Sequence, residues 1–336
     1  MYVLGLDVGG TSSRASLLDA SGRRAGYGRA PGGNPAAYGN AVAVANIGRA
    51  LGLALRGIDP ALVGGAVIGL AGGGALDRLV FDPMWAAAGL RVSPRLTGDL
   101  GIAFAAGTAE PCGTALIAGT GAIAARIEDG EPVMIADGLG WLLGDQGSGF
   151  WVGRKAASAA VHALSRGDAG GRLTGLVAGA LLEGEPLASG TLTSGTVDSG
   201  TLASGTVEEL RALAIRLVVR AQSRPPLELA RLAPLVSRAA TEGDPAALTI
   251  VSDTARLLCE TVAEVRRAGE TSPIVLAGSV LTSEGPIASA VRERLGPSAV
   301  LAGDGAGAAA WLAGREVFGW DPATAARLHA RVVFGD

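Results

Sequence analysis

The chain has 336 residues, of which 49% are apolar and 18% are charged, a composition that is typical of a globular protein and excludes a disordered one. The formal net charge of -3, without any basic run, argues against a surface that binds nucleic acid. A chain of this length is expected to form two domains, each with its own core.

The histidines and cysteines give little support to a zinc site, a Ser-His-Asp triad or a disulfide framework. Cys112 and Cys259 are the only cysteines, and His162 and His329, both in helical patterns, are the only histidines. The start of the chain lacks the basic and apolar regions of a signal peptide, and no uncharged stretch resembles a membrane span. We therefore expect a cytoplasmic protein without a membrane partner.

The first part of the chain predicts three consecutive strands and then alternating helices and strands. The expected strands are 2–8, 13–19, 23–29, 63–71 and 91–97, and the expected helices are 36–56 and about 76–88. This order predicts an α/β fold with a mixed sheet that helices cover.

A second round of the same pattern begins at Gly113. Strands are expected at 114–118, 122–128 and 132–136. The segment ALIAGTGAIAARIEDG resembles the earlier LGLDVGGTSSRASLLDASG. Two related hairpins predict a duplicated unit whose halves face each other across a cleft.

After residue 150 the pattern is mainly helical. A helix is expected from Asp244-Pro245 to about Arg267, a strand at 273–278, and helices at 305–313 and from residue 321 onward. Residues 188–207 contain ASGTL, TSGTV, DSGTL and ASGTV, a polar repeat with a period of five. This repeat predicts an inserted surface loop or an irregular ribbon.

The bend in VLGLDVGGTSSRASLL combines a carboxylate, two glycines and several hydroxyls. Because Gly9 and Gly10 have no Cβ, the backbone can approach a ligand closely. Backbone amides and the hydroxyls of Thr11 and Ser12 can then face an anion. Asp7 alone would repel a phosphate, but a Mg²⁺ ion between them, often held through water, removes this conflict.

The second bend, Gly119-Thr120-Gly121, offers similar groups. Two such bends on facing hairpins could clamp the phosphates of a nucleotide, and the alternative is an ordinary pair of glycine hairpins. The chain contains no Walker A motif and no GxGxxG that opens a helix after a strand. We therefore expect neither a P-loop nor a dinucleotide-binding fold.

Three further side chains are candidates for contact with a substrate. Asp99 follows a predicted strand and could accept the proton of a hydroxyl that attacks a γ-phosphate, or it could cap the helix that begins at Leu100. Asn34, in PGGNPAAYG, could bind a sugar hydroxyl or serve as a turn residue. Asp145, in GLGWLLGDQGSGFWVGR, could bind vicinal hydroxyls or form a turn or cap.

In this order, the motifs resemble the N-acetylglucosamine kinase branch of the BadF/BadG/BcrA/BcrD ATPase family, in the superfamily of sugar kinases, actin and Hsp70. The resemblance covers nearly the whole chain. The segments that carry it are LDVGGTSSRASL, GNP, IGLAG, TGDLGIAFAAG, ALIAGTGAIA, LLGDQGSGFWVGR, EGDPAA and VLAGSVLTS.

The resemblance implies two RNase H-like domains of the actin-like ATPase type, with a central cleft between them. The expected N-terminal lobe comprises residues 1–112, with a C-terminal helix at about 317–333 packing back on it. The expected C-terminal lobe, residues 113–316, would bind the nucleotide and carry the insertion at 188–207. A homodimer is also implied.

The implied activity is ATP-dependent phosphorylation of an amino sugar, N-acetylglucosamine or glucosamine, at its 6-hydroxyl. Asp99 would be the base, and Asp7 would organise Mg²⁺ through water. The residues that would contact ATP are Gly9, Gly10, Thr11, Ser12, Gly119, Thr120, Gly121, Gly278 and Ser279. The residues that would bind the sugar are Asn34, Asp99, Thr120, Gly138, Leu139 and Asp145.

Three residues depart from the resembled pattern near the expected sugar pocket. Gln146 stands where relatives usually have Glu, Leu139 where they have Trp, and Ala122 where they often have a polar residue. The alternatives are an ATPase that activates a radical dehydratase, which would need cluster-bridging cysteines, and a nucleotide- or sugar-binding regulator without catalysis.

Overall fold

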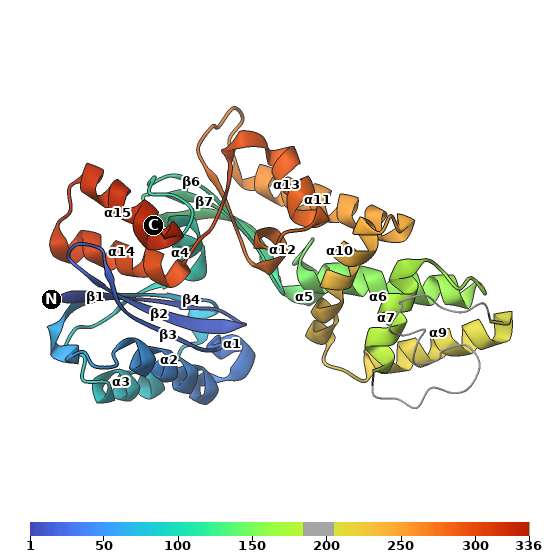
Figure 1. Cartoon of the computed structure of the whole chain (residues 1–336), viewed down its shortest axis with the longest axis horizontal. Coiled ribbons are helices and arrows are strands. Elements are labelled where there is room, and N and C mark those ends of the chain that lie inside the picture. Colours follow the sequence, from blue (N-terminus) through green and yellow to red (C-terminus); the bar gives the residue numbers. More distant parts are fainter. Residues whose placement is uncertain (184–204, 336) are drawn as a thin grey trace.

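The computed structural model describes residues 1–183 and 205–335. Within these residues the strands form two five-stranded sheets, in the orders β3-β2-β1-β4-β5 and β10-β9-β6-β7-β8 (Figure 1). The strands are β1 Tyr2–Val8, β2 Ser12–Asp19, β3 Arg24–Pro31, β4 Val63–Leu70, β5 Arg95–Gly98, β6 Gly113–Ala118, β7 Ala122–Glu128, β8 Glu131–Asp137, β9 Ile274–Ala277 and β10 Ala299–Leu301.

The two sheets have the same topology. In each, the first three strands are antiparallel neighbours, and the last two run parallel to the first. The repeated hairpin sequences therefore belong to two equivalent sheets, as the internal similarity predicts. Because β10 has only three residues, its local pattern did not predict it.

The centre of the first sheet is a strand that is covered on both faces. In β1, Val3, Leu4, Leu6 and Val8 are fully buried, which explains its almost continuous apolar sequence. A Cβ on Gly5 would lie 2.0 Å from the backbone nitrogen of Ala310, so the helix there can approach only a glycine.

Helices α2 Asn40–Ala54 and α3 Arg78–Ala87 share one apolar core with the first sheet. Helices α14 Gly305–Phe318 and α15 Pro322–Phe334 share a separate core with the same sheet. Figure 1 shows α14 and α15, in red, beside the blue strands. The expected boundary at residue 316 would place α14 in the second lobe, but α14 packs against β1, β2 and β4. We therefore propose that the second lobe ends before Gly305.

The helix expected at 36–56 is divided in two. Asn34 caps a short helix, α1 Pro35–Tyr38, and Gly39 separates it from α2 with a φ of 76°. The break places the side chain of Tyr38 over the first glycine bend, where its hydroxyl donates a hydrogen bond of 2.6 Å to the carbonyl of Gly10.

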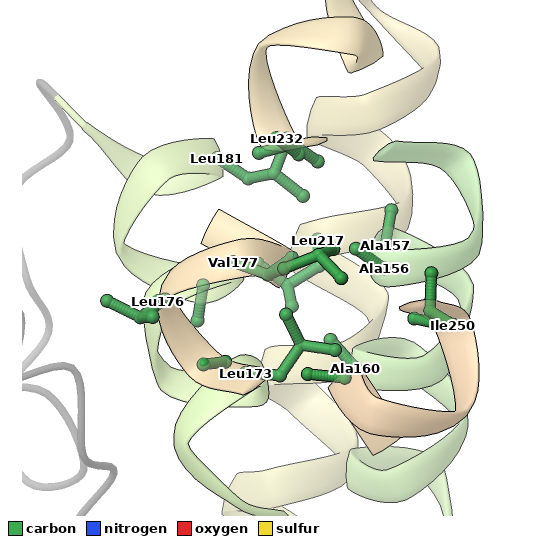
Figure 2. Close-up of a cluster of buried hydrophobic side chains, with 14 of the residues drawn as sticks. Ala156, Ala157, Ala160, Leu173, Leu176, Val177, Leu181, Leu217, Leu232 and Ile250 are labelled. Atoms are coloured by element: carbon green, nitrogen blue, oxygen red, sulfur yellow. The ribbon is translucent and has the colours of Figure 1, made fainter. Parts of the chain in front are cut away.

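The second sheet carries a helical extension with its own core. Side chains from α6 Gly149–Ser165, α7 Arg172–Leu182 and α9 Val207–Gln222 meet in this core (Figure 2). The other α-helices of this part are α5 Gly140–Leu143, α10 Ala233–Thr241, α11 Pro245–Val265, α12 Ser279–Thr282 and α13 Pro286–Leu295. Short 3-10 helices occur in both parts of the molecule, at Pro60–Leu62 and Gly73–Ala75 in the first and at Pro226–Leu232 and Gly296–Ser298 in the second.

Most of the SGT repeat at 188–207 lies outside the described residues. Its last two residues begin α9. The hydroxyl of Thr206 accepts a hydrogen bond from the amide of Glu209, and the Glu209 carboxylate accepts one from the amide of Thr206. This capping box fixes the start of α9 at the last residues of the repeat.

Helix α4, Asp99–Ala105, lies between the two sheets. Its Leu100 and Phe104 share a core with residues of the second sheet, while Ile102 packs in the core of the first. After α4 the chain enters β6, and after β10 it returns to α14. The amide of Gly303 on the returning segment donates a 2.7 Å hydrogen bond to the carbonyl of Ala106 on the outgoing one.

The C-terminal helix reaches α4 through a buried histidine. The ring Nε2 of His329 lies 2.6 Å from the carbonyl oxygen of Ala105, and the ring packs edge-on against Trp311. Burial lowers the pKa of His329 below its ordinary value of 6.5, and the hydrogen bond to Ala105 opposes this shift in part.

A lowered pKa in the folded state means that the unfolded state binds a proton more readily. We therefore expect the contribution of His329 to the free energy of unfolding to be fully present above about pH 6.5. This contribution should be lost as the pH falls, until His329 is also protonated in the folded protein. His329→Gln should reduce this pH dependence in urea unfolding at pH 7.5 and 5.5. The control is His162→Gln, at an exposed histidine of α6. If the free energy of unfolding decreases equally between pH 7.5 and pH 5.5 in the wild type and in His329→Gln, the prediction is wrong.

Candidate active site

The first glycine bend connects β1 to β2 and is held from one side. The amide of Gly9 donates to the carbonyl of Ser12 at 3.0 Å, and the amide of Gly33 donates to the carbonyl of Gly9 at 3.1 Å. A Cβ on Gly10 would meet no atom within 4 Å, and Thr11 is exposed. The bend is therefore fixed by its neighbours and open to a ligand.

A carboxylate lies behind this bend. Asp7 and Arg14 are opposite each other in the β1–β2 ladder, and their side chains form an ion pair of 3.3 Å. A Cβ on Gly305 would be 2.5 Å from Oδ2 of Asp7, so this carboxylate lies against the first turn of α14. The glycine at the helix start thus makes room for Asp7.

Asp7 belongs to a group of three acidic residues. Burial raises the pKa of Asp7, the Arg14 guanidinium lowers it, and the negative charges of Asp304 and Asp99 raise it further. Arg14 also has a buried Nε without a hydrogen-bond partner among the described residues. The partly exposed, positively charged side chain of Arg14, close to an open glycine bend, fits a bound phosphate. Asp7 fits the usual Mg²⁺ site of one carboxylate plus substrate phosphates.

Asp99 is the first residue of α4. The helix cap is Gly98, so the alternative in which Asp99 is itself the cap is wrong. Burial raises the pKa of Asp99, although hydrogen bonds from its own amide and that of Leu100 lower it in part. A carboxylate with a raised pKa at the end of a strand is suited to proton transfer.

Asn34 has a structural role at a turn, because it caps helix α1. Its Oδ1 accepts hydrogen bonds from the amides of Ala36 at 2.9 Å and Ala37 at 3.3 Å. A Cβ on Gly72 would be 2.5 Å from this oxygen, so Asn34 also lies against the loop after β4. Its Nδ2 makes no hydrogen bond to the part of the chain that the structure describes, and can donate to a ligand.

The second glycine bend connects β6 to β7 and is also held from one side. The amide of Gly149 donates to the carbonyl of Gly119 at 2.7 Å, and that of Phe150 donates to Thr120 at 3.3 Å. A Cβ on Gly119 would meet nothing within 4 Å, and Thr120 is exposed. The two bends therefore share the property that a phosphate-binding loop needs, an open backbone on a fixed support.

Asp145 supports this second bend. Its Oδ1 accepts a 3.2 Å hydrogen bond from the amide of Ala122, and a Cβ on Gly121 would lie 3.0 Å from its Oδ2. Burial raises the pKa of Asp145, the Ala122 amide lowers it, and the charge of Asp137 raises it further.

The remaining predicted residues of the second lobe surround the same bend. The amide of Gly138 donates to the carbonyl of Ala122 at 3.0 Å, and Leu139 is 67% exposed at the start of α5. Gly278 has a φ of 84°, and its Cβ would be 2.4 Å from the carbonyl of Ala118, so only glycine brings β9 this close to β6. Ser279 is exposed at the start of α12.

The predicted site residues thus form two groups, one on each sheet. Among the described residues, no hydrogen bond or ion pair joins the groups. None of the predicted residues lines any of three surface cavities, of about 530, 760 and 590 Å³. That both bends face one cleft therefore stays a prediction.

Sequence reasoning missed three residues of these groups: Arg14, Asp304 and Asp137. The pairing of Arg14 with Asp7 follows from the alternation of the predicted hairpin, which could have revealed it. Asp304 precedes a helix of small residues and caps it, and nothing in its local sequence separates it from an ordinary cap. Nothing local distinguishes Asp137 from a turn residue.

The described residues contain neither a cluster of metal ligands nor a membrane-spanning helix. In residues 1–183 and 205–335, no three His, Cys, Asp or Glu side chains come together closely enough to hold a metal ion by themselves. No helix in these ranges has the length and apolarity needed to cross a membrane.

Comparison with known proteins identifies the family. A family model described as the BadF/BadG/BcrA/BcrD ATPase family matches residues 4–297. The chain belongs to this family. The predicted membership in the BadF/BadG/BcrA/BcrD ATPase family is therefore confirmed, although none of the curated protein sequences compared matches the chain.

Solved structures show which fold this BadF/BadG/BcrA/BcrD family member has. A protein from Chromobacterium violaceum, provisionally named an N-acetylglucosamine kinase, is 22% identical, with a TM-score of 0.66 and coverage of 93% of this chain and 98% of that chain. A second protein with the same provisional name, from Porphyromonas gingivalis, is 17% identical, with a TM-score of 0.60 and coverage of 98% of both chains.

A ROK family glucokinase from Streptomyces griseus, in complex with glucose and AMPPNP, is 17% identical to this BadF/BadG/BcrA/BcrD family member. Its TM-score is 0.51, with coverage of 98% of this chain and 99% of that chain. Together with the two equivalent sheets, these similarities confirm the predicted α/β fold with two domains of the actin-like ATPase type.

Proposed function

We propose that this protein is an ATP-dependent kinase that phosphorylates the 6-hydroxyl of an amino sugar, with N-acetylglucosamine and glucosamine as the first candidates. The observation that carries the proposal is the charge group of Asp7, Arg14 and Asp99 beside an open glycine bend. The family membership supports a role for ATP, and the provisional names of the similar structures motivate the choice of sugar.

In the proposed mechanism, both lobes contribute to the binding of ATP. The amides of the Gly9–Ser12 and Gly119–Gly121 bends would bind the phosphates of ATP, and Mg²⁺ held through water by Asp7 would neutralise part of their charge. Phosphoryl transfer needs mainly such positioning and charge neutralisation.

On the acceptor side, the sugar would be held by Asn34 through its free Nδ2, and by Asp145 with its neighbours Gly138, Leu139 and Thr120. The Asp99 carboxylate would accept the proton of the attacking hydroxyl. Gly278 and Ser279 would border the nucleotide.

The proposal includes a cytoplasmic location, where ATP is available. It also includes a homodimer, which light scattering would test.

The first experiment measures ADP release in a coupled assay. The sugars are N-acetylglucosamine, glucosamine, glucose, N-acetylmannosamine and N-acetylmuramic acid, each with ATP and Mg²⁺. We expect sugar-dependent turnover with at least one amino sugar. Phosphorus NMR should show that its product is esterified at C6, and the 6-deoxy analogue of that sugar should give no turnover. Absence of sugar-dependent ADP release with the whole panel would reject the kinase proposal.

A further inference from the structure

A carboxylate that the proposed mechanism does not use holds the segment with Asp145. Oδ1 of Asp137 accepts a 2.6 Å hydrogen bond from the amide of Asp145, and its Oδ2 accepts a 2.7 Å bond from the amide of Gln146. These are short bonds to a charged acceptor, the stronger class of protein hydrogen bond. Both oxygens of one side chain thus fix two consecutive backbone amides.

The backbone around this contact is strained. Asp137 and Asp145 have φ values of 61° and 54°, in the left-handed region that residues with a Cβ seldom adopt. Such conformations persist only where the surroundings impose them. Gly144 is part of these surroundings, because a Cβ there would lie 2.2 Å from Oδ1 of Asp137. The segment from Asp137 to Gln146 is therefore folded around one carboxylate.

The contact continues to the second glycine bend. The amide of Asp145 is held by Asp137, and the carboxylate of Asp145 in turn accepts from the amide of Ala122. The amide of Gly138, next to Asp137, donates to the carbonyl of the same Ala122. The end of β8, Asp145 and the start of β7 thus form a closed set of hydrogen bonds.

The three departures from the resembled pattern lie in this set or beside it. Ala122 contributes its amide and carbonyl, Gln146 contributes its amide, and a Cβ on Gly144 would be 2.8 Å from that of Leu139. With Asp137 and Asp145 already carrying negative charge, a neutral Gln146 avoids adding a third carboxylate.

We propose that Asp137 is a positioning residue, which holds Asp145 and through it the Gly119–Ala122 bend in the conformation that receives sugar and phosphate. This inference rests on the proposed kinase function. It gives Asp145 a double role, as a sugar ligand on one side and as the support of the phosphate bend on the other.

The test is Asp137→Asn, examined first without any ligand. Both oxygens of Asp137 accept from N–H groups, so the NH₂ of Asn must face a donor and one bond is lost. We expect amide hydrogen exchange to become about 10- to 100-fold faster in residues 144–148 and also in 119–123, as for loss of a hydrogen bond to a charged group. Unchanged exchange in 119–123 would overturn the proposed link.

The second measurement separates positioning from a general loss of structure. In steady-state kinetics, Asp137→Asn should raise the sugar KM about 10- to 100-fold, by the same reasoning, with a much smaller change in kcat. A merely structural role would lower the amount of active enzyme and leave KM unchanged, and that result would also overturn the proposal. If the wild type phosphorylates no sugar, the kinase proposal fails, and hydrogen exchange alone decides the role of Asp137.

Two further variants complete the design. Asp59→Asn is the matched control, because Asp59 accepts only one backbone hydrogen bond, from Ala61, and Asn caps as well as Asp. Its exchange and kinetics should equal those of the wild type. Gly144→Ala disturbs the same carboxylate from its other side, and should accelerate exchange in the same two segments even if Asp137→Asn does not fold.

Discussion

Replacing Asp99 by Asn is expected to lower kcat for sugar phosphorylation by about 10²- to 10⁴-fold, the usual contribution of a general base. Asn has the size of Asp and preserves the start of α4, but its amide cannot accept the proton of the attacking hydroxyl. The sugar KM should change only a few-fold. The coupled assay for ADP release, with the sugar that the panel identifies, measures both constants.

The pH profile gives this prediction a second readout. Since burial raises the pKa of Asp99 above its ordinary value of 3.8, the base is protonated at a higher pH than an exposed aspartate would be. Activity of the wild type should therefore rise with pH through this raised pKa, and the residual activity of Asp99→Asn should lack that step. Asp77→Asn, which changes only the cap of α3, is the control. Near wild-type turnover of Asp99→Asn would show that Asp99 is not the base.

Gly5→Ala is expected to be the most destabilising of the substitutions considered, by about 3 kcal/mol or more, at the upper end of the range for overpacking. The new Cβ would lie 2.0 Å from the nitrogen of Ala310 and 2.4 Å from the carbonyl oxygen of Ala306. Both are backbone atoms of α14, so no side chain can move aside, and the helix must leave β1. Because Gly305 and Asp304 at the start of α14 adjoin Asp7, activity should fall as well.

Gly52→Ala is the matched control for this experiment. Gly52 lies within α2, and a Cβ there would meet no atom within 4 Å. The change should stabilise the protein by about 0.5–1 kcal/mol through helix propensity. Urea unfolding of both variants, followed by circular dichroism, should therefore give midpoint shifts of opposite sign. A midpoint for Gly5→Ala that equals or exceeds that of the wild type would contradict the close packing of α14 on β1.

The sequence predicted most of the fold because its main signals are local. The two hairpins show apolar alternation around glycine bends, and Asp244-Pro245 marks the start of α11. The boundary that we propose before α14 could not be read from the sequence, for a physical reason. The small residues of α14 indicate close packing, but they do not indicate against which sheet, and that depends on Gly5, 300 residues earlier.

The candidate site could be proposed from the sequence where chemistry and local pattern coincide. Asp7, Asp99 and both glycine bends occur at strand ends, where functional groups are expected. Asn34 shows the limit, since the same residue type caps helices and binds sugars, and here it does at least the first. Asp137 could not be found, because its partners are backbone amides eight and nine residues away, which leave no trace in residue type.

The paired crossing between the sheets determines how the two halves of the molecule can move. The outgoing segment at Ala106 and the returning segment at Gly303 are hydrogen-bonded to each other, so two adjacent connecting segments join the lobes. A double connection of this kind resists twisting and sliding more than a single linker does, and it leaves rotation about one common axis as the soft motion. Opening and closing would then change the separation of the two glycine bends while each bend keeps its own internal geometry.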